Sequence, residues 1–336
     1  MNNRLDTLFY PFDAGFTDRP AGLALFLGAE PGIQARGADR GTFTCVQGFR
    51  PLYLALRREG FDVRPKPEGD DYAAALVLCG RFRAENEARV AEALRRTRTG
   101  GLIVVGGGKT DGVASLRRRV GDLSSIAGSA SKYHGVVFWL ERPAEAEAER
   151  IVAALSPAEG RVEGKFVTGP GMFSADTVDP ASRLLADSLP GDVKGSVADF
   201  CAGWGYLSAR LAEREGIRSI DLYEAGYEAL EAAKLNLKDV PPAIPIGFYW
   251  LDLASEPVAA RYDAIVMNPP FHQGRAAEPD LGVRMIGTAK AALKPGGRLF
   301  LVANRALPYE KALSEGFRAR GEIVRDAAYK VLWAVR

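Results

Sequence analysis

The chain has 336 residues, 47% of them hydrophobic, and 44 basic against 42 acidic residues give a formal net charge of +2. This length favours two domains with buried cores, and the balanced charge excludes a strongly basic tail. The N-terminus lacks a signal-peptide pattern, no stretch is apolar enough to span a bilayer, and the three cysteines are widely spaced, so we expect a cytoplasmic protein without disulfides or a metal.

The first half of the chain contains segments typical of strands and helices in alternation. We expect strands over 72–79, 100–107 and within 131–141, and a helix over 85–96. An apolar run at 24–32 occupies the place of a first strand and its loop. Strands that alternate with helices predict a parallel sheet with helices on both faces.

The second half alternates more clearly, and its last two strands leave no room for a crossover helix. They should therefore form an antiparallel hairpin at one side of a seven-stranded sheet. Expected strands cover 196–202, 218–224, 246–252, 262–268, 297–304, 322–325 and 329–335, and expected helices cover 207–216, 227–238, 283–293 and 309–317.

The two halves resemble each other in the order and spacing of their segments. Matching segments are 72–79 with 262–268, 100–107 with 296–303, and Lys132 with Lys330. Any two α/β domains look alike to some extent, but the shared order favours an internal duplication. We expect Rossmann-like domains over 1–160 and 161–336, the first degenerate and serving as a scaffold or binding domain, the second catalytic.

A glycine-rich segment, DFCAGWGYLS, joins the first strand and first helix of the second half. Gly203 and Gly205 would let the backbone approach a ligand, although such turns also serve plain packing. The segment lacks the G-x-G-x-x-G fingerprint of dinucleotide sites, and it opens with Asp199. A carboxylate there suits a cationic ligand such as S-adenosylmethionine.

Two further acidic residues end the next two strands. Glu224 could accept hydrogen bonds from both hydroxyls of a ribose, and Asp252 could accept one from an adenine amino group. Each could instead cap the helix that follows it. Together with Asp199, they would line the crevice outside the carboxyl ends of a parallel sheet, where ligands bind.

The fourth strand ends in NPPFHQG, which begins at Asn268. The prolines fix the backbone and remove donors, so rigid carbonyls and the Asn268 side-chain oxygen remain as acceptors. Two fixed acceptors suit a planar NH₂ group, and Phe271 could stack on its ring. A proline pair alone can simply end a strand. Next to the glycine loop, the cluster favours a site that aligns an amine with a methyl donor.

These motifs resemble class I S-adenosylmethionine-dependent methyltransferases, and NPPF resembles the motif of those that methylate exocyclic amines. More narrowly, the chain is similar to the bacterial small-subunit ribosomal RNA guanine-N2 methyltransferases. The similarity is carried by PGMFSADTVDPASRLLADSLP, NPPFHQG, VANRALPYEKAL and YKVLWAV, and by GGGKTDGVASL in the first half. Members of that family are duplicated, with an inactive first domain.

The resemblance implies methyl transfer to N2 of a guanine in 16S ribosomal RNA, free or in the 30S subunit, by an enzyme expected to be monomeric. The implied cofactor-binding residues are Asp199, Cys201, Ala202, Gly203, Trp204, Gly205, Glu224, Asp252, Leu253 and Asn268. The implied catalytic residues are Asn268, Pro269 and Phe271, and the expected substrate contacts are Pro270, Phe271, His272 and Lys330. We expect His272 to position the substrate rather than act as a base, and Lys330 either to contact a phosphate or to be merely solvated.

Two positions depart from the family pattern, and they keep alternatives open. Cys201 stands where glycine is usual, and Trp204 stands where a small residue is usual and could crowd or stack over the cofactor. A non-catalytic relic that binds RNA, or a protein-glutamine N5 methyltransferase, would share many of these motifs. Arginine clusters at 95–98 and 117–119 could contact RNA or serve solubility alone.

Overall fold

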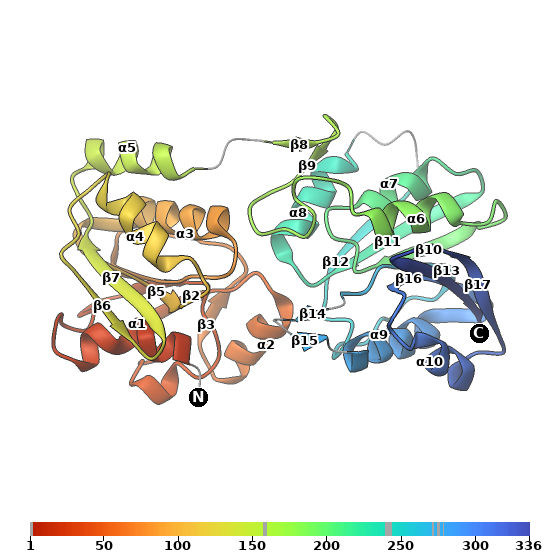
Figure 1. Ribbon diagram of the computed structural model, residues 1–336, viewed down its shortest axis with the longest axis horizontal. Helices are drawn as coiled ribbons and strands as arrows, with labels where there is room; N and C mark the ends of the chain where they lie inside the picture. The colour runs from red at the N-terminus through yellow and green to blue at the C-terminus, as the bar shows by residue number, and fades with distance from the viewer. Residues whose placement is uncertain (1–2, 157–159, 239–243, 271, 274–275, 278) are drawn as a thin grey trace. The chain divides into compact units, whose positions relative to one another are not determined.

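A computed structural model describes residues 3–156, 160–238, 244–270, 272–273, 276–277 and 279–336 (Figure 1). The chain divides into two compact units, Met1–Glu159 and Gly160–Arg336. Each unit is built around its own sheet of seven strands.

The first unit has the strand order β3-β2-β1-β4-β5-β7-β6. Strand β1 lies parallel to β2 and β4, whereas β7 runs antiparallel to β5 and β6. Its elements are α1 (Asn3–Asp13), β1 (Ala24–Leu27), the 3₁₀-helix η1 (Gln34–Arg36), β2 (Phe43–Val46), α2 (Arg50–Arg58), β3 (Asp62–Arg64), β4 (Tyr72–Leu78), α3 (Arg83–Arg96), β5 (Thr97–Gly108), α4 (Val113–Gly121), β6 (Gly128–Lys132), β7 (Gly135–Glu141) and α5 (Glu145–Leu155).

The second unit repeats this order as β12-β11-β10-β13-β16-β18-β17, with β17 and β18 as the antiparallel hairpin. Two short hairpins, β8-β9 and β14-β15, lie outside the main sheet. The elements are β8 (Arg161–Val162), β9 (Phe166–Val167), α6 (Pro180–Ser188), β10 (Gly195–Phe200), α7 (Tyr206–Ala212), β11 (Ile217–Glu224), α8 (Tyr227–Asn236), β12 (Ile246–Trp250), β13 (Tyr262–Met267), β14 (His272–Gln273), β15 (Ala276–Ala277), α9 (Pro279–Ala292), β16 (Leu293–Asn304), α10 (Tyr309–Gly316), β17 (Ala319–Arg325) and β18 (Tyr329–Val335).

The identical strand order confirms the predicted duplication and fold class, but one part of the predicted alignment is wrong. Lys132 ends β6, the outer strand of its hairpin, whereas Lys330 lies in the inner strand β18 and pairs with Ala303. The first-unit residue in the equivalent register is Val136, which pairs with Gly107. The two lysines therefore lie on different strands of their hairpins.

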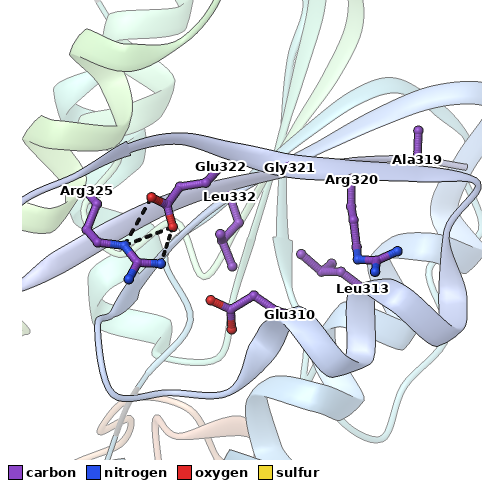
Figure 2. A pocket seen from close by; sticks show the side chains of 8 residues that line it. All are labelled: Glu310, Leu313, Ala319, Arg320, Gly321, Glu322, Arg325 and Leu332. Atoms are coloured by element: carbon purple, nitrogen blue, oxygen red, sulfur yellow. Dashed lines mark hydrogen bonds and ion pairs between the residues drawn. The ribbon is translucent and has the colours of Figure 1, made fainter.

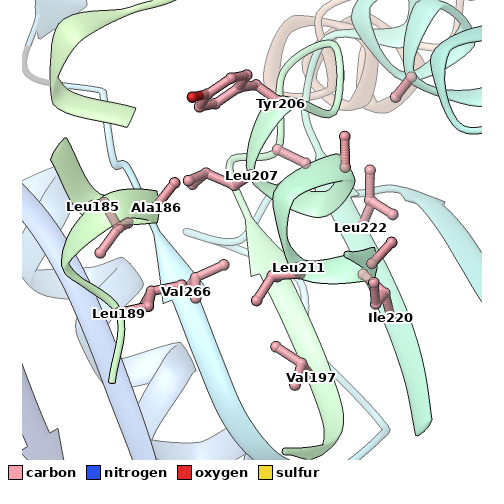
Figure 3. Packing of buried hydrophobic residues seen from close by; sticks show 14 of the residues in the cluster. Leu185, Ala186, Leu189, Val197, Tyr206, Leu207, Leu211, Ile220, Leu222 and Val266 are labelled. Atoms are coloured by element: carbon pink, nitrogen blue, oxygen red, sulfur yellow. The ribbon is translucent and has the colours of Figure 1, made fainter. Parts of the chain in front are cut away.

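The central strands of the second unit are apolar on both faces, as expected for parallel strands covered by helices. Helices α6, α7 and α8 pack on one face and α9 and α10 on the other. Figure 3 shows the first of these layers, where Leu185 and Leu211 pack near Val197 and Val266. Burial of each such side chain stabilises the fold by roughly 1.5–3 kcal/mol, which fixes the helix ends that surround the candidate site.

Candidate active site

Strand register brings the predicted polar strand ends to one level at the carboxyl edge of the sheet. Asp199 in β10 pairs with Leu222 in β11 and with Val266 in β13. Glu224 and Asn268, each two residues further along its strand, therefore flank the start of the loop that follows β10. In a parallel sheet this edge is where ligand crevices form.

The loop after β10 makes a tight turn with positive φ at Cys201 (61°), Gly203 (55°) and Gly205 (90°). A Cβ added at Gly203 would meet nothing within 4 Å, so this glycine faces open space. Gly205 is the N-cap of α7, and a Cβ there would lie 3.2 Å from the Cβ of Ala233. The N–H of Ala202 donates to the carbonyl of Tyr223 at 3.1 Å, which ties the loop to β11.

Glu224 anchors this loop through its carboxylate. Oε2 accepts a hydrogen bond from the N–H of Gly203 at 2.8 Å, and Oε1 accepts one from the N–H of Gly226 at 2.7 Å. Burial raises the pKa of Glu224, and these backbone hydrogen bonds oppose the rise. Glu224 therefore ends a strand as predicted. Its two carboxylate oxygens, predicted to accept hydrogen bonds from a ribose, also accept hydrogen bonds from the backbone.

Asp252 caps a turn and not the N-terminus of a helix, which was the alternative considered for it from the sequence. Its Oδ1 accepts from the N–H of Ala254 at 3.0 Å, and its Oδ2 accepts from the Ser255 hydroxyl at 2.5 Å. The neighbouring Leu253 is buried, and its carbonyl accepts from the Thr288 hydroxyl at 2.8 Å. The third acidic strand end is therefore held rigidly.

Asp199 is fully buried, and one of its two carboxylate oxygens has a hydrogen-bond partner among the described residues. Its Oδ2 accepts a hydrogen bond from the Ser208 hydroxyl at 2.7 Å, whereas its Oδ1 has no hydrogen-bond partner among the described residues. Burial raises the pKa of Asp199 to about 7, and the bond from Ser208 opposes this rise. A buried oxygen without a partner is uncommon in proteins and indicates a place for a ligand or water.

Cys201 lies among the three acidic strand ends. Burial raises the pKa of its thiol well above the usual value, and the negative charges of Glu224, Asp199 and Asp252 add to the effect. The thiol is therefore protonated and packs with its Sγ 3.6 Å from the Sδ of Met285 in α9. The structure thus brings the three carboxylates around one loop.

The side chain of Trp204 belongs to the hydrophobic core. Its ring is 5% exposed and lies 5.1 Å from the ring of Phe166 in β9, centroid to centroid. Its indole N–H donates to the carbonyl of Phe173 at 3.1 Å. These contacts favour a packing role over the predicted stacking on a cofactor.

Asn268 has a defined amide orientation. Its Nδ2 donates to Oδ2 of Asp179 at 2.8 Å and to the hydroxyl of Ser182 at 2.7 Å. A carboxylate only accepts hydrogen bonds, so the amide nitrogen must face Asp179. The Asn268 oxygen is then left without a partner in the part of the chain that the structure describes.

The rest of the NPPFHQG segment is described only in part. Pro269 is buried and Pro270 is exposed. Phe271 and the side chain of His272 lie outside the described residues, although the backbone of His272 pairs with Ala277 in β14-β15. The predicted acceptor at Asn268 is therefore seen, and the predicted aromatic contact stays a prediction.

Sequence reasoning missed Asp179 and Ser182 as parts of this site. The available signal was the DPAS sequence at 179–182, an N-cap aspartate followed by proline at the first helical position. That pattern predicts the start of a helix. It gives no indication that the cap also contacts Asn268, 89 residues later.

Known proteins are similar to this chain in sequence and in fold. A family model described as the methyltransferase small domain matches residues 163–333, about half of the chain. The chain belongs to the methyltransferase small domain family. The predicted class I methyltransferase fold is confirmed, and the match lies in the unit that holds the acidic strand ends and Asn268.

Individual proteins that this methyltransferase resembles include ribosomal RNA methyltransferases. It is 35% identical over 175 residues to "Ribosomal RNA small subunit methyltransferase C" of Salmonella choleraesuis, covering 52% of this chain and 50% of that protein, and 35% identical over 174 residues to its Salmonella arizonae counterpart. The chain thus matches about half the length of these curated relatives. The solved 16S rRNA N2 methyltransferase of T. thermophilus, in complex with AdoMet and guanosine, superposes with a TM-score of 0.80 at 27% identity, covering 100% of this chain and 92% of that one.

In its described residues, the first unit of this methyltransferase differs from the second at the end of its first strand. Where α7 follows the glycine loop in the second unit, only η1 follows β1. Arg89 donates to the Leu78 carbonyl at 2.8 Å, and its Nη1 would lie 2.7 Å from a Cβ added at Gly28. A guanidinium therefore fills the end of β1, which is consistent with the predicted degeneracy of this copy.

Lys330, a predicted substrate contact, is buried in the methyltransferase unit. Its Nζ donates to the Leu307 carbonyl at 2.7 Å and to Oε1 of Glu310 at 2.6 Å. These bonds join β18 to α10 and favour a structural role over contact with a phosphate. Glu310 also lines an open hollow of about 510 Å³ between α10 and the β17-β18 hairpin (Figure 2). Neither Asn268 nor the acidic strand ends line that hollow.

Among the described residues, no helix is long and apolar enough to cross a membrane. The same residues contain no group of three His, Cys, Asp or Glu side chains that could hold a metal ion.

Proposed function

We propose that this protein transfers a methyl group from S-adenosylmethionine to the exocyclic N2 amine of a guanine in small-subunit ribosomal RNA. The observation that carries the proposal is the orientation of Asn268, whose amide nitrogen is held and whose oxygen is left to accept a hydrogen bond. The T. thermophilus structure, solved with AdoMet and guanosine, and the Salmonella ribosomal RNA methyltransferases support it.

The residues around the glycine loop fit S-adenosylmethionine. The unpartnered Oδ1 of Asp199 suits a cationic ligand, and the open space at Gly203 suits a close backbone approach. We expect Glu224 to accept ribose hydroxyls, and Asp252 with Leu253 to hold the adenine. The remaining loop residues, Cys201, Ala202, Trp204 and Gly205, would contribute backbone groups. When bound, the cofactor supplies an electrophilic methyl group.

The side chains of the protein would act mainly by alignment. The Asn268 oxygen and the Pro269 carbonyl would accept hydrogen bonds from the two N–H groups of the guanine amine, which directs the nitrogen lone pair to the methyl carbon. The nitrogen would become cationic as its bond to the methyl carbon forms and the bond from that carbon to sulfur breaks. It would then lose a proton to water, so a strong base is not needed. Phe271 would stack on the base, and Pro270 and His272 would position it.

The substrate guanine must leave its stack to reach such a site, at a cost of a few kcal/mol. We propose that the first unit, with the predicted bounds 1–160, serves mainly as a scaffold and contributes less to RNA binding. Three arginines of the predicted basic clusters pair with carboxylates, because Arg95 and Arg96 share Glu92, and Arg119 pairs with Glu87. We expect a monomer that acts on ribosomal RNA or the 30S subunit in the cytoplasm.

Labelled methyl transfer to undermethylated small ribosomal subunits tests this proposal. After the reaction, RNA and protein are separated, and the RNA is digested to nucleosides. We expect the label in N2-methylguanosine. Label in protein glutamine would indicate the alternative N5 methyltransferase, and cofactor binding without transfer to either fraction would contradict an enzymatic role on the ribosome.

A further inference from the structure

We propose that Asp179 and Ser182 are positioning residues that hold the Asn268 amide with its oxygen toward the substrate amine. The inference rests on the proposed function of Asn268. It adds two residues at the start of α6 that act through their hydrogen bonds with Asn268.

Three groups meet at the N-terminus of α6. Oδ2 of Asp179 accepts from the N–H of Ser182 at 2.8 Å and from Nδ2 of Asn268 at 2.8 Å. The Ser182 hydroxyl accepts the other hydrogen of the same Nδ2 at 2.7 Å. Asp179 is 9% exposed, so water competes little for its carboxylate.

The hydrogen bond between Asn268 and Asp179 is needed to fix the amide, because a side-chain amide has two nearly equivalent orientations about its last torsion. In the flipped orientation, the Asn268 oxygen would face the Asp179 carboxylate, which has no hydrogen to donate. The flipped state would also present an N–H donor to the substrate amine, which is itself a donor. Asp179 therefore excludes the unproductive orientation by charge, and Ser182 adds a second acceptor.

The N-terminus of α6 is held in place by the core. Ala181, Leu185 and Ala186 of α6 are buried in the cluster that includes Val266 of β13, two residues before Asn268. Figure 3 shows Leu185 and Ala186 beside Val266. The helix cap and the strand end thus share one rigid layer, so Asp179 can hold Asn268 at a fixed distance.

A helix cap alone does not explain the arrangement. Capping requires only the bond from the Ser182 N–H to Asp179, whereas the Ser182 hydroxyl takes no part in it. Asparagine caps helices as well as aspartate does, so Asp179→Asn keeps the cap but removes the charge that sets the amide orientation. Ser182→Ala keeps the cap and removes one acceptor.

The test is a set of single-turnover measurements on the full chain with Ser182→Ala, Ser182→Thr, Asp179→Asn and Asn268→Ala. We expect Ser182→Ala and Asp179→Asn each to lower the transfer rate about 5- to 10-fold, the effect of roughly one hydrogen bond. Cofactor affinity and melting temperature should stay near the wild-type values. Ser182→Thr retains the hydroxyl and should recover most of the rate.

A double-mutant cycle separates positioning from general stability. In the Asn268→Ala background, Ser182→Ala should change the rate no further, because no amide remains to orient. Unchanged rates in the Ser182→Ala and Asp179→Asn single variants, or equal losses in both backgrounds, would overturn the positioning role. If Asn268→Ala itself keeps full activity, the proposed role of Asn268 has failed instead.

Discussion

The N–H of Gly203 donates to the carboxylate of Glu224 at 2.8 Å and links the loop after β10 to the end of β11. The second carboxylate oxygen accepts a hydrogen bond from the N–H of Gly226. This one side chain therefore shapes the glycine loop and stands at the proposed ribose position.

Replacement of Glu224 should weaken cofactor binding. In Glu224→Gln, one of the two carboxylate oxygens becomes an NH₂ group that cannot accept from a backbone N–H. Loss of a hydrogen bond to a charged group predicts about a 10- to 100-fold higher Kd for S-adenosylmethionine, measured by calorimetry. Glu231→Gln is the matched control, because Glu231 lies in α8, is 43% exposed at its side chain and pairs with Lys234. Equal affinities in both variants would contradict the assignment.

Asp199 should make stability depend on pH in the unusual direction for a carboxyl group. Its pKa rises from 3.8 to about 7 in the folded chain, so the folded state holds a proton that the unfolded state has released. The associated stability is present below pH 4 and is lost as pH rises through 7. Between pH 5 and 8, the wild type should lose on the order of 3 kcal/mol relative to Asp199→Asn, by urea denaturation. Parallel pH profiles for the two proteins would contradict this.

Cys201 occupies a backbone conformation that favours glycine, with φ of 61°. Cys201→Gly and Cys201→Ala both lose the contact with Met285, but alanine keeps a Cβ in the left-handed region. We therefore expect the glycine variant to be about 1 kcal/mol more stable than the alanine variant in chemical denaturation. An alanine variant of equal or greater stability would show that the loop relaxes.

Lys330→Met distinguishes a structural lysine from a phosphate contact. Loss of the bonds to Leu307 and Glu310 should cost about 1–3 kcal/mol of unfolding free energy. RNA affinity and its salt dependence should stay unchanged, as in the exposed control Lys311→Met. A salt-dependence slope reduced by about one would instead assign Lys330 to a phosphate.

The alternation of strands and helices, the terminal hairpin and the acidic strand ends were predictable because they depend on local periodicity and on which residues end each strand. Asp199, Glu224 and Asn268 were found in this way. Their partners were not, because the contact between Asp179 and Asn268 and the burial of Lys330 depend on packing between segments far apart in sequence. The orientation of the Trp204 side chain also depends on a distant residue, because its ring packs on Phe166. Phe166 lies in the β8-β9 hairpin, whose strands are too short to be predicted from the sequence pattern.

The role of Asn268 is tested most directly by the rate of methyl transfer to undermethylated small subunits by Asn268→Ala, with its cofactor affinity measured in parallel. We expect wild-type affinity for S-adenosylmethionine and a loss of transfer to guanine N2 of about 100-fold or more, the cost of a group that aligns the reacting atoms. Transfer at the wild-type rate with Asn268→Ala would contradict it.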